Sequence, residues 1–169
     1  IFNDDEGVLF AEIKKPVDSP NTYQLLSLSD GSTSNTVSFG WTSGGDELFA
    51  RIIANGVVPV SYILGDYKSD TYYKVALKYK SGDSSVWVNG ERVHIDADTF
   101  TFSGNLKSIQ FNYGDSGSYP FYGNARQLLY FNEALTDAEL EALTSSNIDR
   151  VLKNYNRRGE LLGATYESD

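Results

Sequence analysis

Apolar and polar residues alternate along much of the chain, and the alternation is clearest in the segment YYKVALKYK at 72–80. Every odd-numbered residue from Tyr73 to Tyr79 is apolar or aromatic, whereas the even-numbered positions carry three lysines. A period of two is that of a β-strand, in which successive side chains point to opposite faces. We therefore expect a strand with one face in a hydrophobic core and a wetter opposite face.

A hairpin is predicted to follow this strand. The polar stretch SGDS at 81–84 leads into a second alternating segment that contains Val86 and Val88. That segment ends at Asn89 and Gly90, a pair that readily takes the positive φ values of a tight turn. The alternation then resumes, so a further strand is expected after the turn.

Alternating segments of this kind recur at short intervals, separated by turn-forming runs such as TSGGD and YGDSGSY. Gly, Asn, Asp and Ser favour turns, and the many aromatic and β-branched residues favour strands. We expect strands at 7–13, 23–29, 36–41, 48–54, 57–64, 72–80, 85–89, 106–111 and 125–131. Many short strands with this spacing predict an all-β fold in which two antiparallel sheets form a sandwich.

The period changes near the C-terminus, where LTDAELEALT at 135–144 predicts a short helix. Thr136 is placed as its N-cap and Glu139 follows three residues later, which is the arrangement of a reciprocal capping box. A second amphipathic helix is predicted beyond it, with Gly159 as its stop. The apolar stripe of this second helix, which would dock on a partner, consists of Ile148, Val151, Leu152 and Tyr155.

The composition narrows the classes of function. The formal net charge is −9 and the 14 Lys and Arg residues are mostly scattered, so no nucleic-acid partner is expected, because phosphate binding needs a concentrated basic field. The chain has no cysteine and therefore no disulfide framework. No apolar run approaches the roughly 20 residues of a membrane helix, so no membrane insertion is expected. The chain opens at Ile1 without methionine, and we expect it to be a piece of a longer protein.

Four segments carry a family resemblance: LLSLSDG, YYKVALKYKSGDSSVWVNGERV, LKSIQFNYG and FYGNARQLLYFNEALTDAELEALT. Together they resemble the laminin-G-like, concanavalin-A-like jelly-roll domains, and most of all the lectin-like modules of bacteriophage tail-fibre and tailspike proteins and of bacterial surface proteins. The resemblance implies a jelly-roll domain at 1–144, with rim loops or a concave face open to glycans. Residues 145–169 lie outside the resemblance, and we expect them to form a helical extension or a linker to a following module. The resemblance also implies an extracellular or virion location and, within a fibre, a homotrimer.

Glycan binding needs flat aromatic faces for the apolar side of a sugar ring and a few polar groups for its hydroxyls. Trp87 faces outward if the valines on either side of it face the core, and fills the core if they do not. The aromatic residues of the loop 112–122 either contact a ligand or close the edge of the sandwich, and Trp41 fits the core better than a binding platform. The candidate residues are Trp41, Trp87, Asn112, Tyr113, Asp115, Tyr119 and Tyr122.

One structural calcium ion is a further candidate ligand, and no other cofactor is expected. Laminin-G-like domains frequently hold one calcium at the rim, and calcium takes six to eight oxygen ligands, often from several loops. The candidate ligands are Asp30, Asn35, Asp46 and Asp115, and they do not form a continuous calcium-binding loop. The alternative is that these residues stabilise local turns, which Asp and Asn favour.

Signatures of catalysis are weak. Laminarinase-like enzymes on this fold carry Glu-x-Asp-x-x-Glu on one strand face, and the sequence lacks that motif. Its acidic runs, NDDEG at 3–7 and DAELE at 137–141, fit a polar terminus and a helix cap. His94 has Asp96 two residues away on the same strand face, but no nucleophile motif accompanies the pair. We therefore do not expect an enzyme.

The function that the sequence favours is a non-catalytic carbohydrate-recognition module that binds cell-surface glycans. Its acidic composition would favour neutral or basic saccharides, unless calcium bridges an acidic one. The alternative is a purely structural or protein-interaction domain that decorates a virion or spaces other modules. A glycan-cleaving enzyme is the third and weakest interpretation.

Overall fold

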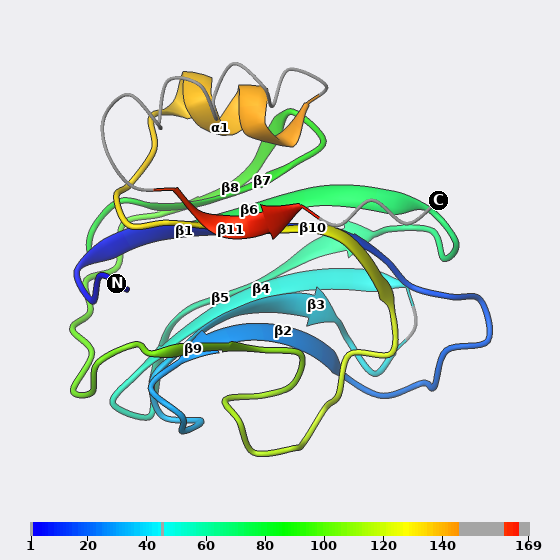
Figure 1. Cartoon of the computed structure of the whole chain (residues 1–169), viewed down its shortest axis with the longest axis horizontal. Coiled ribbons are helices and arrows are strands. Elements are labelled where there is room, and N and C mark those ends of the chain that lie inside the picture. The colour runs from blue at the N-terminus through cyan, green and yellow to red at the C-terminus, as the bar shows by residue number, and fades with distance from the viewer. Residues whose placement is uncertain (1, 45, 146–160, 166–169) are drawn as a thin grey trace.

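Two antiparallel β-sheets stacked face to face form the body of the protein in its computed structural model (Figure 1). The structure describes residues 2–44, 46–145 and 161–165, the last segment by its backbone. The six-stranded sheet has the order β11-β10-β1-β6-β7-β8, and the five-stranded sheet has the order β5-β4-β3-β2-β9. The predicted all-β, jelly-roll type of sandwich is confirmed.

The strands lie close to the predicted positions. The six-stranded sheet contains β1 (Glu6–Lys14), β6 (Tyr72–Lys80), β7 (Ser84–Val88), β8 (Glu91–Asp96), β10 (Asn124–Phe131) and β11 (Leu161–Thr165). The five-stranded sheet contains β2 (Gln24–Ser29), β3 (Thr36–Trp41), β4 (Glu47–Ala54), β5 (Val57–Asp66) and β9 (Ser108–Gln110). The predicted hairpin is confirmed, because β6 pairs antiparallel with β7. Asn89 and Gly90 after it have φ values of 50° and 89°.

The main core lies between the two sheets, because alternate residues of every long strand point inward. Its fully buried members from the six-stranded sheet include Leu9, Val75, Leu77, Tyr79 and Val86. Those from the five-stranded sheet include Leu28, Val37, Phe39, Trp41 and Ile52. Burial of this apolar surface from both layers is the main term that stabilises the sandwich.

A second hydrophobic cluster lies on the outer face of the six-stranded sheet, beneath helix α1 (Asp137–Thr144) (Figure 1). Ala76 and Trp87 of the sheet and Leu140 of the helix belong to this buried cluster. The expectation that the second face of β6 is wetter is therefore wrong in part, since Ala76 is buried and Lys78 is only 5% exposed. The reason is that helix α1, which is distant in sequence, covers this face of the sheet. The alternation within one strand cannot predict such a contact.

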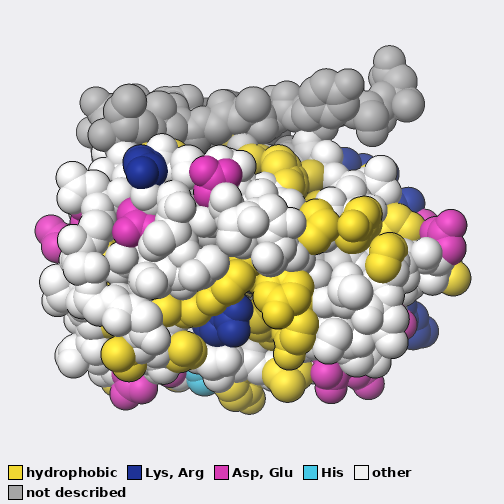
Figure 2. Space-filling view, turned by 90° about the horizontal axis from the view of Figure 1, so that it is seen from below, with side chains coloured by type: hydrophobic (Ala, Val, Ile, Leu, Met, Phe, Trp, Pro, Cys, Tyr) yellow, Lys and Arg dark blue, Asp and Glu magenta, His cyan; other side chains and the backbone are white. Residues whose placement is uncertain are grey.

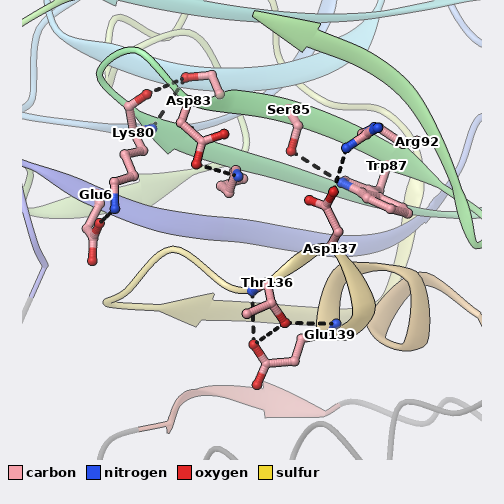
Figure 3. A network of polar contacts seen from close by, with 11 residues as sticks. Glu6, Lys80, Asp83, Ser85, Trp87, Arg92, Thr136, Asp137 and Glu139 are labelled. Atoms are coloured by element: carbon pink, nitrogen blue, oxygen red, sulfur yellow. Dashed lines mark hydrogen bonds and ion pairs between the residues drawn. The ribbon is translucent and has the colours of Figure 1, made fainter. Parts of the chain in front are cut away.

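Helix α1 begins with the predicted capping box (Figure 3). The backbone N–H of Glu139 donates to the Thr136 side chain, and the backbone N–H of Thr136 donates to the Glu139 carboxylate at 2.9 Å. Two backbone donors that no helical carbonyl could reach are thereby satisfied. Arg92 of β8 forms an ion pair with Asp137, which joins the start of the helix to the sheet.

The C-terminal tail is described only in part. The predicted second helix, with its stripe of Ile148, Val151, Leu152 and Tyr155, lies outside the described residues. Residues 161–165 form β11, a strand that the sequence analysis did not predict and that pairs antiparallel with β10. Within the described segments, no helix has the length and apolar character needed to cross a membrane.

Candidate functional site

A polar row of side chains crosses the outer face of the five-stranded sheet. From β9 to β5, the strand registers place Gln110, Ser27, Ser38, Arg51 and Ser61 side by side. The residues before and after Arg51, Ala50 and Ile52, belong to the core between the sheets, so the row points away from the core. Arg51 is the charged residue of this row, and it lies between two serines.

The loop 111–123 folds from the end of β9 across this face, below the five-stranded sheet in Figure 1. The Gly114 N–H donates to the hydroxyl of Ser27 at 3.0 Å, and that hydroxyl donates to the Asn112 carbonyl at 2.6 Å. The Leu25 N–H donates to the Tyr119 carbonyl at 3.1 Å. These bonds fix the loop to β2 and place its tyrosines over the sheet.

Four residues of the loop have a positive φ, which few side chains tolerate: Gly114, Asp115, Gly117 and Tyr119. Gly114 has a φ of +57°, and a Cβ there would lie 2.2 Å from the Ser32 carbonyl oxygen, so only glycine fits. Tyr119 has a φ of 52°. A non-glycine residue in that region costs about 1–3 kcal/mol, which the surrounding contacts must offset. The loop is thus built to hold one particular shape.

Five side chains meet in a closed ring on this face, and we call them the Arg51 cluster: Tyr23, Phe49, Arg51, Tyr113 and Tyr119. The guanidinium carbon of Arg51 lies 5.1 Å from the centroid of Tyr113 and 5.7 Å from that of Phe49. Tyr119 lies 5.8 Å from Tyr113 and 5.3 Å from Tyr23, and Tyr23 lies 5.6 Å from Phe49 between ring centroids. Figure 2, a view of this side of the molecule, shows a basic side chain enclosed by hydrophobic ones.

The Arg51 cluster has a buried floor and an exposed rim. Phe49 is 4% exposed and lies at the bottom, whereas Tyr119 is 42% exposed and stands at the surface. Tyr23, Tyr113 and Arg51 are half-buried. The cluster therefore offers ring faces and edges to a ligand while its members hold one another in place.

The guanidinium of Arg51 has no carboxylate partner within the part of the chain that the structure describes. Its Nε atom is buried and has no hydrogen-bond partner, and it forms no ion pair with any carboxylate of the described residues. Six other cations do form ion pairs with carboxylates: Lys14, Lys15, Lys78, Lys80, Arg92 and Arg126. Arg51 differs from these cations because its buried Nε also lacks a hydrogen-bond partner.

The structure gathers some of the predicted glycan-binding residues and separates others. Tyr113 and Tyr119 lie in the Arg51 cluster. Asn112 shapes the loop, because its side-chain oxygen accepts a hydrogen bond from the Asp115 N–H at 3.0 Å, and Asp115 itself is exposed. Tyr122 is 52% exposed, and its N–H donates to the Gln24 side chain outside the cluster.

Three members of the cluster were missed in the sequence: Tyr23, Phe49 and Arg51. For Phe49 and Arg51 a signal was present, since they alternate with the apolar core residues of β4 and must therefore share the opposite face. Tyr23 carries no comparable signal. It precedes β2, and only the fold of the loop 111–123 brings Tyr119 beside it.

The two tryptophans are buried, so neither of these candidate residues offers an open ring face to a glycan. Trp41 fills the core, as the sequence favoured, and Trp87 points outward but is covered. Trp41 is 0% exposed in the main core, where its ring lies 5.9 Å from that of Phe121. Trp87 does point away from the valines on either side of it, but helix α1 covers that face and leaves the ring 6% exposed. Its Nε1 donates to the Ser85 hydroxyl at 3.2 Å, and Arg92 lies over the ring (Figure 3).

The predicted calcium ligands serve other contacts. Asp30 accepts hydrogen bonds from the Ser32 hydroxyl at 2.6 Å and from the Asn35 amide at 2.8 Å. Asp46 instead lies near Lys15 and accepts a hydrogen bond from Ser69. Among the residues that the structure describes, no three acidic or histidine side chains come close enough together to hold a metal ion. The alternative interpretation, that these residues stabilise turns, fits the hydrogen bonds better.

The environment of Asp30 also favours its charged form. Burial alone would raise the pKa of this carboxyl, but the hydrogen bonds from Ser32 and Asn35 and the nearby charge of Lys107 outweigh it and hold the pKa below its usual value. The carboxylate is therefore part of the loop architecture before β3.

His94 and Asp96 lie on one strand face, as the sequence suggests. The His94 Nε2 and an oxygen of Asp96 are 3.5 Å apart, and the His94 ring stacks on Tyr62 of β5 at 3.8 Å between centroids. These contacts link the edges of the two sheets. No serine or threonine hydroxyl is recorded in hydrogen-bond contact with His94 among the described residues, so the arrangement resembles a packing contact more than a catalytic triad.

No family model matches the chain, and no curated protein sequence matches it. Solved structures do match, and those described next are lectin-like β-sandwiches. The carbohydrate-binding module CBM40 of the Ruminococcus gnavus IT-sialidase gives a TM-score of 0.61 at 20% identity, over 85% of this chain and 84% of that one. The same module bound to α2,6 sialyllactose gives 0.60 at 21% identity over 85% of each chain.

Domain 4 of AbnA, a GH43 extracellular arabinanase from Geobacillus stearothermophilus, is a second similar structure and is in complex with arabinotriose. Its TM-score is 0.60 at 19% identity, over 86% of this chain and 68% of that one. A SAP-like pentraxin from Limulus polyphemus gives 0.60 at 16% identity, over 84% and 70%. At such low identities the likeness shows a shared jelly-roll fold, and function must be argued from the site.

Proposed function

We propose that the protein is a non-catalytic carbohydrate-recognition domain that binds a glycan at the Arg51 cluster. The observation that carries this proposal is the closed, half-exposed ring of aromatic side chains on the outer face of the five-stranded sheet. The polar row beside it has buried serines in its middle, but Ser61 and Gln110 at its ends are accessible, so apolar and polar contacts are available on one face.

A sugar ring has an apolar face of C–H groups and a rim of hydroxyls. The tyrosine rings of the Arg51 cluster can stack on the apolar face of the sugar. The side chains of Ser61 and Gln110, at the two ends of the polar row, can form hydrogen bonds with its hydroxyls. Because the ring contacts hold the tyrosines in place before a ligand arrives, little side-chain entropy is lost on binding.

The similar structures support a role in glycan binding at a coarse level. The Ruminococcus gnavus module is bound to sialyllactose and the arabinanase domain to arabinotriose. Neither establishes the sugar for this chain, since both are under 25% identical to it.

The wider setting is part of the same proposal. The resemblance to lectin-like modules of phage tail fibres and bacterial surface proteins suggests a cell-surface glycan as the partner and an extracellular or virion location. In a fibre the domain would act as a homotrimer, and several weak sites would then combine into tight binding through effective concentration.

The test is a glycan array followed by titration calorimetry with the strongest hit. Tyr119→Ala should weaken that binding about 5- to 30-fold, the equivalent of one or two kcal/mol, because it removes an exposed stacking face. The matched control is Tyr62→Ala, since Tyr62 is also 42% exposed but contacts His94 at the edge between the sheets.

Equal loss of binding in both variants would contradict the assignment of the site. An array that stays silent with the parent protein would contradict glycan recognition itself and would favour the spacer or protein-interaction role.

A further inference from the structure

We propose that Arg51 binds the carboxylate of an acidic sugar, of the uronic or sialic acid type, so that the glycan recognised by the Arg51 cluster carries a negative charge. This inference rests on the proposed function and specifies the ligand class of the same site. It differs from the sequence-based expectation that the acidic chain would favour neutral or basic saccharides.

The first argument is the state of the guanidinium. A partly buried charge is costly unless it is paired and hydrogen-bonded. The Nε of Arg51 is buried and lacks a hydrogen-bond partner, and the described residues supply no carboxylate to pair with it. The rings of Phe49 and Tyr113 stabilise the cation by contact with their π faces, which holds the guanidinium in place without neutralising it.

The second argument comes from Arg126 on the other sheet, where an arginine with similar surroundings is paired. The guanidinium carbon of Arg126 lies 3.7 Å from the ring centroid of Tyr72, so it too is held over an aromatic face. Its NH1 atom has an oxygen of Glu12 3.8 Å away. Among the described residues, a carboxylate lies beside Arg126 and none lies beside Arg51, which leaves Arg51 open to a carboxylate from the ligand.

The third argument is the distribution of charge around the site. The other four members of the Arg51 cluster are uncharged aromatic residues, and its neighbours in the polar row, Ser38 and Ser61, are uncharged as well. No member of the cluster carries a negative charge that would repel an anion at close range. The net charge of −9 on the chain, however, disfavours binding of a ligand with many negative charges. A single acidic sugar residue satisfies both conditions, because it brings one carboxylate to one cation.

The shape of the two groups also fits. A guanidinium is a planar fork of donors that matches a carboxylate through two parallel hydrogen bonds, which a lysine ammonium cannot reproduce. The exposed side chain of Ser61, next to Arg51 in the row, can serve a hydroxyl of the same sugar.

The experiment first compares ligands on the unaltered protein. Sialyllactose and lactose differ only in the sialic acid, and a glucuronic-acid-containing disaccharide can be compared with its carboxyl-reduced form. Calorimetry should show about 10- to 100-fold tighter binding of at least one charged ligand over its neutral counterpart, as expected for a hydrogen-bonded charged contact. The preference should decrease as salt is raised, because the contact is partly exposed.

The second arm changes the protein. Arg51→Gln should abolish the preference for the charged ligand, and Arg51→Lys should restore only part of it, because lysine keeps the charge but not the fork. Arg126→Gln makes the same change of charge on the opposite sheet and should keep the full preference. Thermal unfolding of each variant shows whether it is folded before its binding is interpreted.

Each outcome decides between the two claims. Equal affinity for charged and neutral partners would overturn the carboxylate inference while leaving glycan binding intact. A preference that survives in Arg51→Gln would overturn the role of Arg51. If neither these ligands nor an array produces binding, both the carboxylate inference and the proposed function are overturned. A preference for the charged ligand that is lost in Arg51→Gln and kept in Arg126→Gln supports both claims.

Discussion

At the scale of single residues, the candidate site depends on backbone geometry as much as on side chains. Tyr119 reaches its neighbours from a left-handed conformation, and Gly114 passes so close to Ser32 that no Cβ fits. Both residues lie in the loop that supplies two of the four aromatic rings of the Arg51 cluster. A change in loop conformation would therefore reach the site directly.

Two glycines of this loop provide a matched comparison. Gly114 and Gly117 both have positive φ, but a Cβ at 117 would meet nothing within 4 Å, whereas a Cβ at 114 would overlap the Ser32 carbonyl. Gly117→Ala should destabilise by about 1–2 kcal/mol through the backbone alone. Gly114→Ala should cost more and also weaken glycan binding, since the loop must move.

Urea unfolding and calorimetry measure the two effects. Identical unfolding midpoints for the two variants would show that the contact with Ser32 does not constrain the loop.

At the scale of elements, the sequence predicted the strands well because each long strand has one face in the core. In β6, for example, Val75 and Leu77 are fully buried, as the period of two requires. The same logic extends to Arg51, whose outward direction follows from the core residues on either side of it. The sequence could not show that segments distant in the chain cover parts of the sheets. Helix α1 covers Trp87, and the loop 111–123 covers Ser27.

Helix α1 illustrates both sides of this limit. Its capping box could be predicted from Thr136 and Glu139, because these two residues lie only three positions apart in the sequence. Its docking on the six-stranded sheet depends on the ion pair with Arg92 and on apolar contacts with residues far away in the chain.

Removal of the cap tests how far the helix supports its sheet. Thr136→Ala should lower the free energy of unfolding by about 0.5–2 kcal/mol, because the backbone N–H of Glu139 in the first turn loses its acceptor. Thr136→Ser keeps the hydroxyl and should retain most of that stability. Urea unfolding followed by tryptophan fluorescence is a suitable measurement, since Trp87 lies beneath the helix. An alanine variant as stable as the serine variant would contradict the role of the cap.

At the scale of the whole molecule, the N-terminal segment ties the two sheets together at one end. The hydroxyl of Tyr79 donates to the Asn3 carbonyl at 2.5 Å, and the Asn3 N–H donates to the hydroxyl of Tyr130 at 2.8 Å. Asp4 accepts a hydrogen bond from the Leu106 N–H, just before β9 of the other sheet. The two buried phenols also contact each other, with their oxygens 2.9 Å apart.

This closure predicts a loss of stability in alkali. Burial, with a smaller contribution from Tyr130, raises the pKa of Tyr79 above its usual value, and burial also raises the pKa of Tyr130. Both groups are neutral in the folded chain, whereas the unfolded chain releases their protons from about pH 10 upward. Their contribution to stability is therefore fully present below about pH 10 and is lost as the pH rises further.

Unfolding in urea at about pH 8 and about pH 10.5 measures the effect. Tyr79→Phe should be less stable at the lower pH, by about 1–3 kcal/mol, because it leaves the Asn3 carbonyl and the Tyr130 hydroxyl short of a partner. It should lose less stability than the parent protein between the two values. Tyr122→Phe removes one phenol from an exposed ring and is the control. If the pH dependence of stability is unchanged in Tyr79→Phe, the alkaline loss of stability does not come from the Tyr79 phenol.

The alternation along β4 has one more consequence. Leu48, Ala50 and Ile52 build the interior, while Phe49 and Arg51 face outward beside Ser61 and Ile63 of β5. Residues that build the interior and residues of the proposed glycan site thus lie on opposite faces of one strand. Substitutions at the outward positions can therefore alter the proposed site while the interior packing stays unchanged.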